Sequence, residues 1–118
     1  MSRLSTHVLD TAIGIPAVGI KIELFSIQGD KKNLIKEVLT NSDGRTNKPI
    51  LDKEEFFLGN FELIFHVGDY LTNRLETPDN LQGLLYDFIP VRFKIFSHRN
   101  YHIPLLLSPF GYSTYLGS

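Results

Sequence analysis

Apolar and polar residues alternate with a period of two along most of the chain, as they do in strands that bury one face. This pattern predicts strands over residues 4–10, 18–28, 34–40, 60–67 and 89–97. The last run, residues 101–118, predicts a β-hairpin whose turn is the Ser-Pro-Phe-Gly at 108–111. A chain end built as a strand of Tyr, Thr and Tyr is unusual, and it indicates that the C-terminus is part of a site.

The first predicted strand has two distinct faces. One carries Leu4, Thr6 and Val8, and the other carries Ser5, His7 and Leu9. His7 therefore points away from Val8. In the strand at 89–97, a proline at the second position favours the edge of a sheet or the start of a strand.

Three further local features complete the pattern. Residues 41–46 contain Asp-Gly, which supplies the hydrogen bonding and positive φ of a tight turn, and Arg45 follows this glycine directly. Residues 68–75 carry Tyr70, Leu71 and Arg74 at helical spacing without a breaker and predict one short helix, which needs packing on the sheet for stability. Residues 77–83 predict a loop from their Pro, Asn and Gly content.

These elements predict a mainly all-β fold, an antiparallel β-sandwich of six or seven short strands with one short helix. We expect a single domain over residues 1–118, because no internal repeat or boundary is visible. Phe25, Ile27 and Phe96 lie on the faces opposite the main apolar sets of their strands. Apolar residues on both faces of a small sandwich predict that other subunits cover part of its outside.

The composition argues against several classes of partner. Twelve basic residues against thirteen acidic ones, with no basic run beyond Lys31-Lys32, offer no electrostatic footprint for nucleic acid or an anionic membrane. No apolar run approaches the roughly 20 residues that span a bilayer. The N-terminus also lacks the apolar segment of a signal peptide. We therefore expect a cytoplasmic protein, and a periplasmic one only if a leader has been omitted.

The lack of cysteine removes disulfides, thiolate nucleophiles and Cys-ligated zinc from consideration. The imidazoles are then the main candidates for proton transfer near neutral pH, and they are His7, His66, His98 and His102. Any one of them taken alone is more often a structural or surface residue. His98 and His102 have a zinc-like spacing, but they flank a strand start without a third ligand nearby, so we expect no metal.

The pattern alone leaves Arg45 open to two interpretations. It is either a solvated turn residue or a planar, permanently charged group that pairs with a carbonyl or an anionic ring. The sequence contains neither a Gly-x-Ser-x-Gly elbow nor a glycine-rich phosphate loop.

Four segments are distinctive in combination. They are Leu-Ser-Thr-His-Val-Leu-Asp-x-x-x-Gly-x-Pro-Ala from residue 4, Thr-Asn-Ser-Asp-Gly-Arg from residue 40, Phe-Glu-Leu-x-Phe from residue 61, and Tyr-His-x-Pro-Leu-Leu-Leu-Ser-Pro-x-x-Tyr-Ser-Thr-Tyr-x-Gly-Ser from residue 101. Together they resemble the transthyretin-related 5-hydroxyisourate hydrolases over essentially the whole chain. Transthyretin itself, the hormone carrier of the same fold, resembles the C-terminal hairpin but lacks the enzymes' histidines and their Gly-Ser terminus.

The resemblance implies roles where residues match. His7, Arg45, His102 and Ser118 stand at catalytic positions of these hydrolases, and His7, Arg45 and Tyr115 at substrate-binding ones. The two histidines would share the proton handling through the terminal serine. Arg45 would pair with oxygens of the substrate, and Tyr115 would form a wall of the pocket.

One position departs from the resemblance. The hydrolases usually end in Tyr-Arg-Gly-Ser, whereas this chain has Leu116 before Gly117. If the last strand is regular, Leu116 points to the face opposite Tyr115, so a side chain there need not touch the substrate.

The resemblance implies hydrolysis of 5-hydroxyisourate to 2-oxo-4-hydroxy-4-carboxy-5-ureidoimidazoline in urate breakdown, with no cofactor. It also implies a homotetramer, a dimer of dimers, with sites in the channel between subunits. The alternative is a non-catalytic carrier of a small aromatic ligand, like transthyretin. That alternative gives no reason for His7, Arg45 and His102 to occur together.

Overall fold

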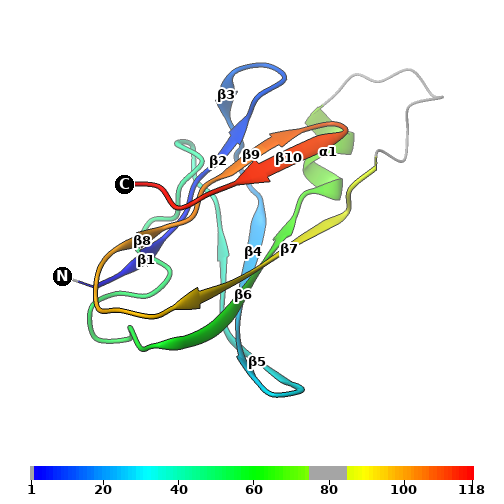
Figure 1. Ribbon diagram of the computed structural model, residues 1–118. Helices are drawn as coiled ribbons and strands as arrows, with labels where there is room; N and C mark the ends of the chain where they lie inside the picture. Colours follow the sequence, from blue (N-terminus) through cyan, green and yellow to red (C-terminus); the bar gives the residue numbers. More distant parts are fainter. Residues whose placement is uncertain (1, 75–84) are drawn as a thin grey trace.

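The protein folds into two packed β layers with one short helix at one end, as seen in a computed structural model that describes residues 2–74 and 85–118 (Figure 1). One sheet is antiparallel with the order β5-β4-β6-β7, and its strands are β4 (Lys21–Gln28), β5 (Lys31–Leu39), β6 (Gly59–His66) and β7 (Phe88–Ile95). The sandwich predicted from the alternation is confirmed. The predicted strand at 34–40 was too short at its start, because β5 begins at Lys31.

The second layer is built from the two ends of the chain. Its main sheet has the order β10-β9-β2-β3, with β2 (Val8–Asp10), β3 (Ile15–Pro16), β9 (Leu105–Ser108) and β10 (Gly111–Thr114). A two-stranded piece, β1 (Leu4–Ser5) with β8 (Tyr101–His102), continues the lines of β2 and β9 (Figure 1).

This layer is not purely antiparallel, which refines the predicted architecture. β1 pairs with β8 and β2 pairs with β9 in parallel, at a constant register in which Ser5 faces His102 and Val8 faces Leu105. Parallel pairing needs a long crossover, and the whole first sheet supplies it. The predicted strand at 4–10 is divided into β1 and β2, but the backbone pairing continues across the gap, where the N–H of Ile103 donates to the carbonyl of Ser5 at 2.9 Å and the N–H of Leu105 donates to the carbonyl of His7 at 2.8 Å.

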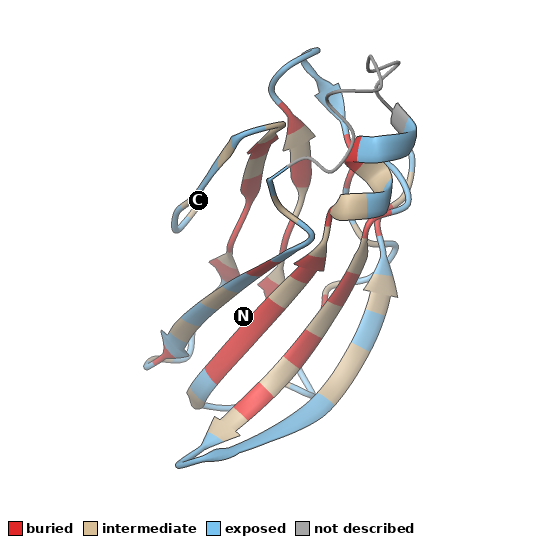
Figure 2. Ribbon diagram, turned by 90° about the vertical axis from the view of Figure 1, so that its right-hand side faces the viewer, coloured by how far each residue is buried: buried red, intermediate tan, exposed pale blue. Residues whose placement is uncertain are grey.

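The alternation correctly predicted the inner faces of both layers. Along these strands, buried residues alternate with less buried ones (Figure 2). The core residues supplied by the first sheet are Ile22, Leu24, Phe61, Leu63, Phe65, Ile89 and Ile95. They meet Leu4, Val8, Leu105 and Leu107 from the second layer. Each such side chain contributes about 1.5–3 kcal/mol when it is fully buried, so the core holds the two chain ends in place against the first sheet.

The predicted helix, turn and edge strand are confirmed. Helix α1 (Gly68–Arg74) packs Leu71 into the core. Gly44 has φ of +72°, the left-handed conformation that the Asp-Gly turn requires. The proline-bearing strand β7 lies at the edge of its sheet. The loop predicted at 77–83 lies outside the described residues.

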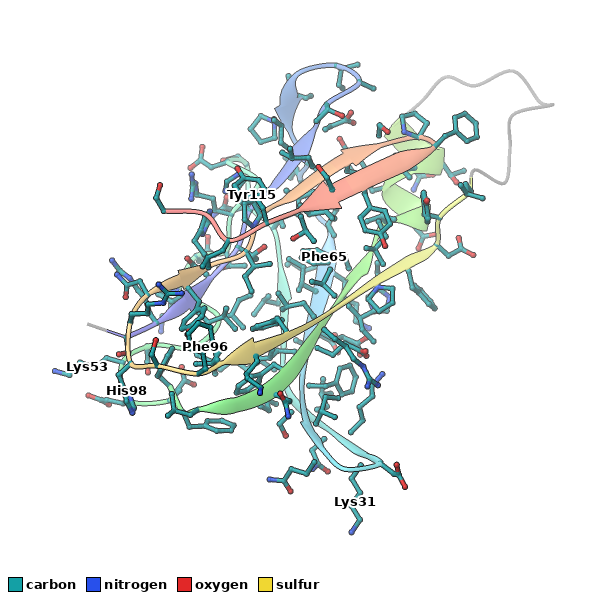
Figure 3. All side chains as sticks on the ribbon, viewed as in Figure 1. Lys31, Lys53, Phe65, Phe96, His98 and Tyr115 are labelled. Atoms are coloured by element: carbon teal, nitrogen blue, oxygen red, sulfur yellow. The ribbon has the colours of Figure 1, made fainter. Side chains whose placement is uncertain are left out.

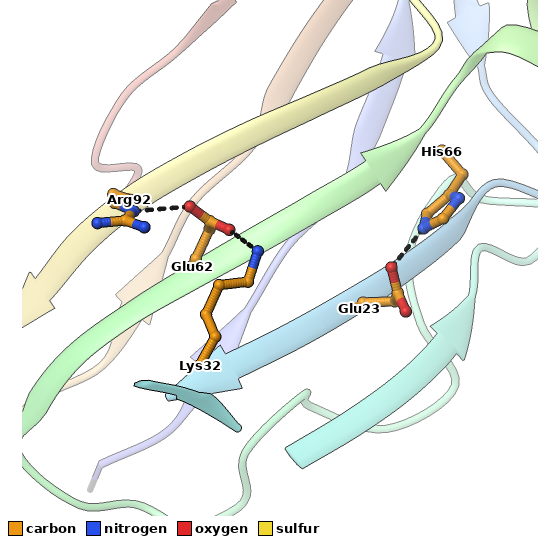
Figure 4. Close-up of polar contacts among 5 residues, drawn as sticks. All are labelled: Glu23, Lys32, Glu62, His66 and Arg92. Atoms are coloured by element: carbon orange, nitrogen blue, oxygen red, sulfur yellow. Dashed lines mark hydrogen bonds and ion pairs between the residues drawn. The ribbon is translucent and has the colours of Figure 1, made fainter. Parts of the chain in front are cut away.

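The outer face of the first sheet carries a network of charged side chains (Figure 4). Glu62 is only 5% exposed, and it accepts contacts of 2.7 Å from both Lys32 and Arg92. Burial alone would raise the pKa of Glu62, but the hydrogen bonds from these two cations outweigh burial and lower it. Lys32 also lies over the ring of Phe25, 4.6 Å from its centre. The network therefore covers Phe25 within one chain.

Candidate active site

Two histidine rings form the centre of the candidate site. Nδ1 of His7 lies 2.7 Å from Nε2 of His102, and the ring centres are 4.8 Å apart. The other ring nitrogen of His102, Nδ1, is 2.8 Å from the hydroxyl of Ser5. Both rings point outward because the strand alternation buries their chain neighbours, which are Thr6 and Val8 beside His7 and Tyr101 and Ile103 beside His102. The pairing of the chain ends therefore brings together two imidazoles from distant parts of the sequence.

Arg45 joins the histidines from a third segment. The turn at Gly44 brings the chain against the N-terminal strand, where the N–H of Val8 donates to the carbonyl of Gly44 at 2.8 Å. A β-bridge pairs His7 with Arg45 in the next position. A side chain at Gly44 would lie 2.5 Å from the carbonyl oxygen of Val8, so the close approach also requires a glycine there. Arg45 is thus held beside the pair and is itself an exposed residue.

The surroundings of the pair disfavour its protonation. Burial is the largest cause that lowers the pKa of His7, followed by His102 and then Arg45. The pKa of His102 is lowered by burial first and by Arg45 second. Both shifts go down from 6.5, so the pair is mainly neutral at pH 7. A neutral imidazole can accept a proton, which is what a general base needs.

The chain end closes over His102. The N–H of Gly117 donates to the carbonyl of His102 at 2.6 Å. A side chain at Gly117 would lie 2.9 Å from Cδ2 of the His102 ring, so only a glycine permits this approach. The strand predicted to run to the last residue in fact ends at Thr114. The tail then bends so that Tyr115, Gly117 and Ser118 line the same pocket as the histidines.

This pocket has a volume of about 560 Å³. His7, Arg45, His102, Tyr115 and Ser118, all predicted from the sequence, line it together. Leu116 does not; it lies in a separate apolar groove with Phe93, Phe96 and Ile103. Tyr115 lines both this groove and the polar pocket. The expected opposite facing of Leu116 and Tyr115 depended on a regular strand, whereas the strand ends at Thr114 and the tail is bent.

Several lining residues were missed by the sequence analysis. Arg3 and Lys48 add positive charge to that of Arg45, and none of the described residues that line the pocket is acidic. Ser5 lies next to His102, and its place on the same strand face as His7 was the one available signal. An anionic or oxygen-rich ligand fits such a wall, because the fixed positive charges of Arg3, Arg45 and Lys48 offer charge-assisted hydrogen-bond donors.

The remaining histidines lie elsewhere. His66 contacts Glu23 at 2.5 Å on the outer face of the first sheet (Figure 4). His98 packs against Phe56, and it lies away from Tyr115 (Figure 3). Over residues 2–74 and 85–118, no group of three His, Cys, Asp or Glu side chains is placed to hold a metal ion. In the same residues no helix is long and apolar enough to cross a membrane.

Residues 4–117 match the HIUase/Transthyretin family model. The chain is 49% identical to a "5-hydroxyisourate hydrolase 2" from Rhizobium meliloti, over 98% of this chain and 96% of that one. Among solved structures, an (S)-allantoin synthase superposes with a TM-score of 0.87 at 38% identity, and the match covers 99% of this chain but 44% of that one. The 5-hydroxyisourate hydrolase of Klebsiella pneumoniae superposes with a TM-score of 0.80 at 28% identity, over 100% of both chains.

Proposed function

This chain belongs to the HIUase/Transthyretin family, and from that premise we propose that it hydrolyses the ring of 5-hydroxyisourate in the pocket around His7 and His102. The observation that carries the proposal is the hydrogen-bonded, neutral histidine pair beside a fixed arginine in one polar pocket. Hydrolysis of a cyclic amide needs a base for water, a donor for the developing oxyanion and a wall that orients the ring. The described residues supply candidates for each role, and the reaction as proposed uses no cofactor.

The histidine pair handles the proton in this proposal. Nε2 of His7 takes a proton from water, and the resulting hydroxide oxygen bonds to a ring carbonyl carbon. The C–N bond then breaks as the tetrahedral oxyanion collapses, and the leaving nitrogen receives the proton that the pair has held. One proton is taken and one is returned, so the pair ends as it began. The 2.7 Å bond to His102 spreads the transient positive charge over both rings.

Arg45 stabilises negative charge on the substrate. Its planar guanidinium donates in a fork that matches two oxygens, and Arg3 and Lys48 add to the positive potential of the same wall. Tyr115 presents an exposed ring, at 53% exposure, as a flat wall for the heterocycle. Ser118 lies at the pocket and is placed there by the bond between Gly117 and His102, so its hydroxyl is a candidate to position the attacking water.

The carrier alternative fits the pocket less well. Sites for aromatic ligands are lined mainly by apolar side chains, whereas this pocket has three cationic and two imidazole side chains among its walls. A carrier also has no use for a base whose pKa is lowered below 6.5. Both features favour turnover over storage.

We also propose that the working form is a homotetramer, a dimer of dimers, in which sites lie between subunits. Support comes from large apolar side chains left exposed in a single chain, among them Ile13, Ile15, Val18, Phe88, Phe96 and Leu116. Partner subunits are the simplest cover for such residues. Sedimentation velocity measures the assembly directly, and a monomer at micromolar concentration would contradict the proposed tetramer.

Two further expectations from the sequence stay predictions. They are that residues 1–118 form a single domain and that the protein is located in the cytoplasm.

A decay assay tests the activity. Urate oxidase generates 5-hydroxyisourate in the cuvette, and its absorbance is followed with and without this protein. We expect a decay rate that rises in proportion to enzyme concentration. Unchanged spontaneous decay, together with binding of an aromatic ligand in a separate titration, would support the carrier instead.

A further inference from the structure

Ser5 contacts the histidine pair at the end opposite His7. Ser5 and His102 are direct partners in the parallel register of β1 and β8, so their side chains leave the layer side by side. The hydroxyl lies 2.8 Å from Nδ1 of His102, while Nε2 of the same ring lies 2.7 Å from Nδ1 of His7. The three side chains therefore form one line of hydrogen bonds, and Nε2 of His7 is the ring nitrogen left to face a ligand.

A neutral pair can hold its shared proton in two ways. If His102 donates from Nε2, then Nδ1 of His7 accepts, His7 carries its own proton on Nε2, and Nδ1 of His102 accepts from the serine. If His7 donates from Nδ1, its Nε2 is a free base, and Nδ1–H of His102 donates to the serine. The group bonded to Nδ1 of His102 thus influences whether His7 offers an acid or a base.

A hydroxyl differs from the other common partners of histidine at this point. A carboxylate or a backbone carbonyl only accepts, so it holds the ring in a single tautomer. A serine hydroxyl rotates and either donates or accepts, so it satisfies His102 in both arrangements. The described side chains that line this pocket include no carboxylate that could replace it.

We propose that Ser5 is a positioning residue for the histidine pair, and that its hydroxyl supports both proton arrangements. When Nε2 of His7 takes a proton from water, Nδ1–H of His102 passes one proton through the Ser5 hydroxyl to solvent in the pocket, and the same path returns a proton when His7 protonates the leaving nitrogen in ring opening. This inference rests on the proposed function, because those two steps are what the exchange serves. The charged and titratable groups near His102 are its partner His7 and the guanidinium of Arg45. Arg3 and Lys48 line the same pocket. Ser5 reaches the substrate through His102 and His7.

The test compares Ser5→Ala with Ser5→Thr. Alanine removes the hydroxyl, whereas threonine keeps it and suits a strand. Loss of one hydrogen bond to the pair is expected to lower kcat roughly tenfold and to leave KM within about twofold. Threonine is expected to recover at least half of the wild-type kcat. The matched control is Ser108→Ala, which removes a serine hydroxyl that donates to Gly111 in the β9–β10 turn, away from the pocket.

Nitrogen-15 NMR of the histidine rings supplies a readout that does not depend on activity. In Ser5→Ala the ring-nitrogen shifts of His7 are expected to change although Ser5 does not touch that ring, and in Ser5→Thr and Ser108→Ala they should match wild type. Wild-type kcat and unchanged His7 shifts in Ser5→Ala would overturn the role of Ser5. So would a threonine variant as impaired as the alanine one. A wild-type protein without hydrolase activity would instead overturn the proposed function, and the NMR comparison would still judge Ser5.

Discussion

Nδ1 of His7 and Nε2 of His102 are 2.7 Å apart although 95 residues separate the two side chains in the sequence. The parallel register of the two chain ends produces this contact, since Ser5 faces His102 and Val8 faces Leu105. The core residues Leu4, Val8 and Leu105 fix that register from the buried face of the layer. The candidate site therefore depends directly on the pairing between the N-terminal and C-terminal strands.

Arg45→Lys tests whether the planar fork matters. Lysine keeps the charge but donates as a point charge, so we expect kcat/KM to fall about tenfold or more while the fold is unchanged. Steady-state kinetics measure it. Arg92→Lys is the matched control, because Arg92 pairs with Glu62 on the outer face and should tolerate the change kinetically. If Arg45→Lys is kinetically silent, Arg45 is only a solvated turn residue.

The alternation of apolar residues was sufficient to predict the fold and the outward face of His7. Local pattern cannot reveal the parallel pairing, because no short turn joins segments so far apart in sequence. For that reason Ser5 was placed on the right face, but its contact with His102 was not foreseen.

Arg45 and the tail show the same limit. The pattern predicted the tight turn before Arg45, whereas its bridge to His7 is a tertiary contact. The strand predicted to run to the last residue ends at Thr114. Beyond it the chain bends toward His102, where the N–H of Gly117 donates to the carbonyl of His102. The resemblance to a family, and not periodicity, supplied Tyr115 and Ser118 as candidates.

The pH dependence follows from the lowered pKa values of the two histidines. Activity should be full above pH 6.5 and fall as the pair becomes protonated at lower pH. Folding stability should change in the same direction. The unfolded chain takes up protons from about pH 6.5 downward, so stability contributed by the neutral pair is complete above that pH and is lost as the pH falls through the folded values.

Arg45→Met tests the electrostatic part of this shift. Removal of the positive charge makes protonation easier, so the pKa of both His7 and His102 should rise toward 6.5. Proton NMR titration of the ring signals measures both groups. Arg3→Met is the control, since Arg3 lines the pocket but is not among the groups that shift either histidine. Unchanged or lower values in Arg45→Met would contradict the assignment.

Gly117→Ala tests the placement of the tail. Its new methyl group would lie 2.9 Å from Cδ2 of His102, so the tail must move away from the ring. Displacement of about an ångström is expected to lower kcat/KM by roughly 10- to 100-fold, while circular dichroism stays that of wild type. Gly111→Ala is the control, because its methyl would meet only the Ser108 hydroxyl at 3.5 Å. Full activity in Gly117→Ala would remove the tail from the site.

Leu116→Arg restores the residue usual in the hydrolases at this position. Leu116 lies in the apolar groove rather than in the polar pocket, so we expect kcat/KM to change by less than about threefold. A gain of about tenfold, equivalent to about 1.4 kcal/mol of transition-state stabilisation, would mean that the arginine reaches the substrate. Sedimentation of the variant is needed as well, because a charge in this groove can weaken subunit contacts.

His7 and His102 are proposed to act as one unit, and a double-mutant cycle tests this coupling most directly. His7→Asn and His102→Asn are each expected to lower kcat by about 100-fold or more, with His98→Asn as an exposed control that retains wild-type activity. Residues that act as a unit lose their function together. The kcat of the double mutant should therefore lie within about threefold of the kcat of the less active single mutant. Losses that multiply, giving a double mutant about 10⁴-fold below wild type, would show two independent groups and contradict the account.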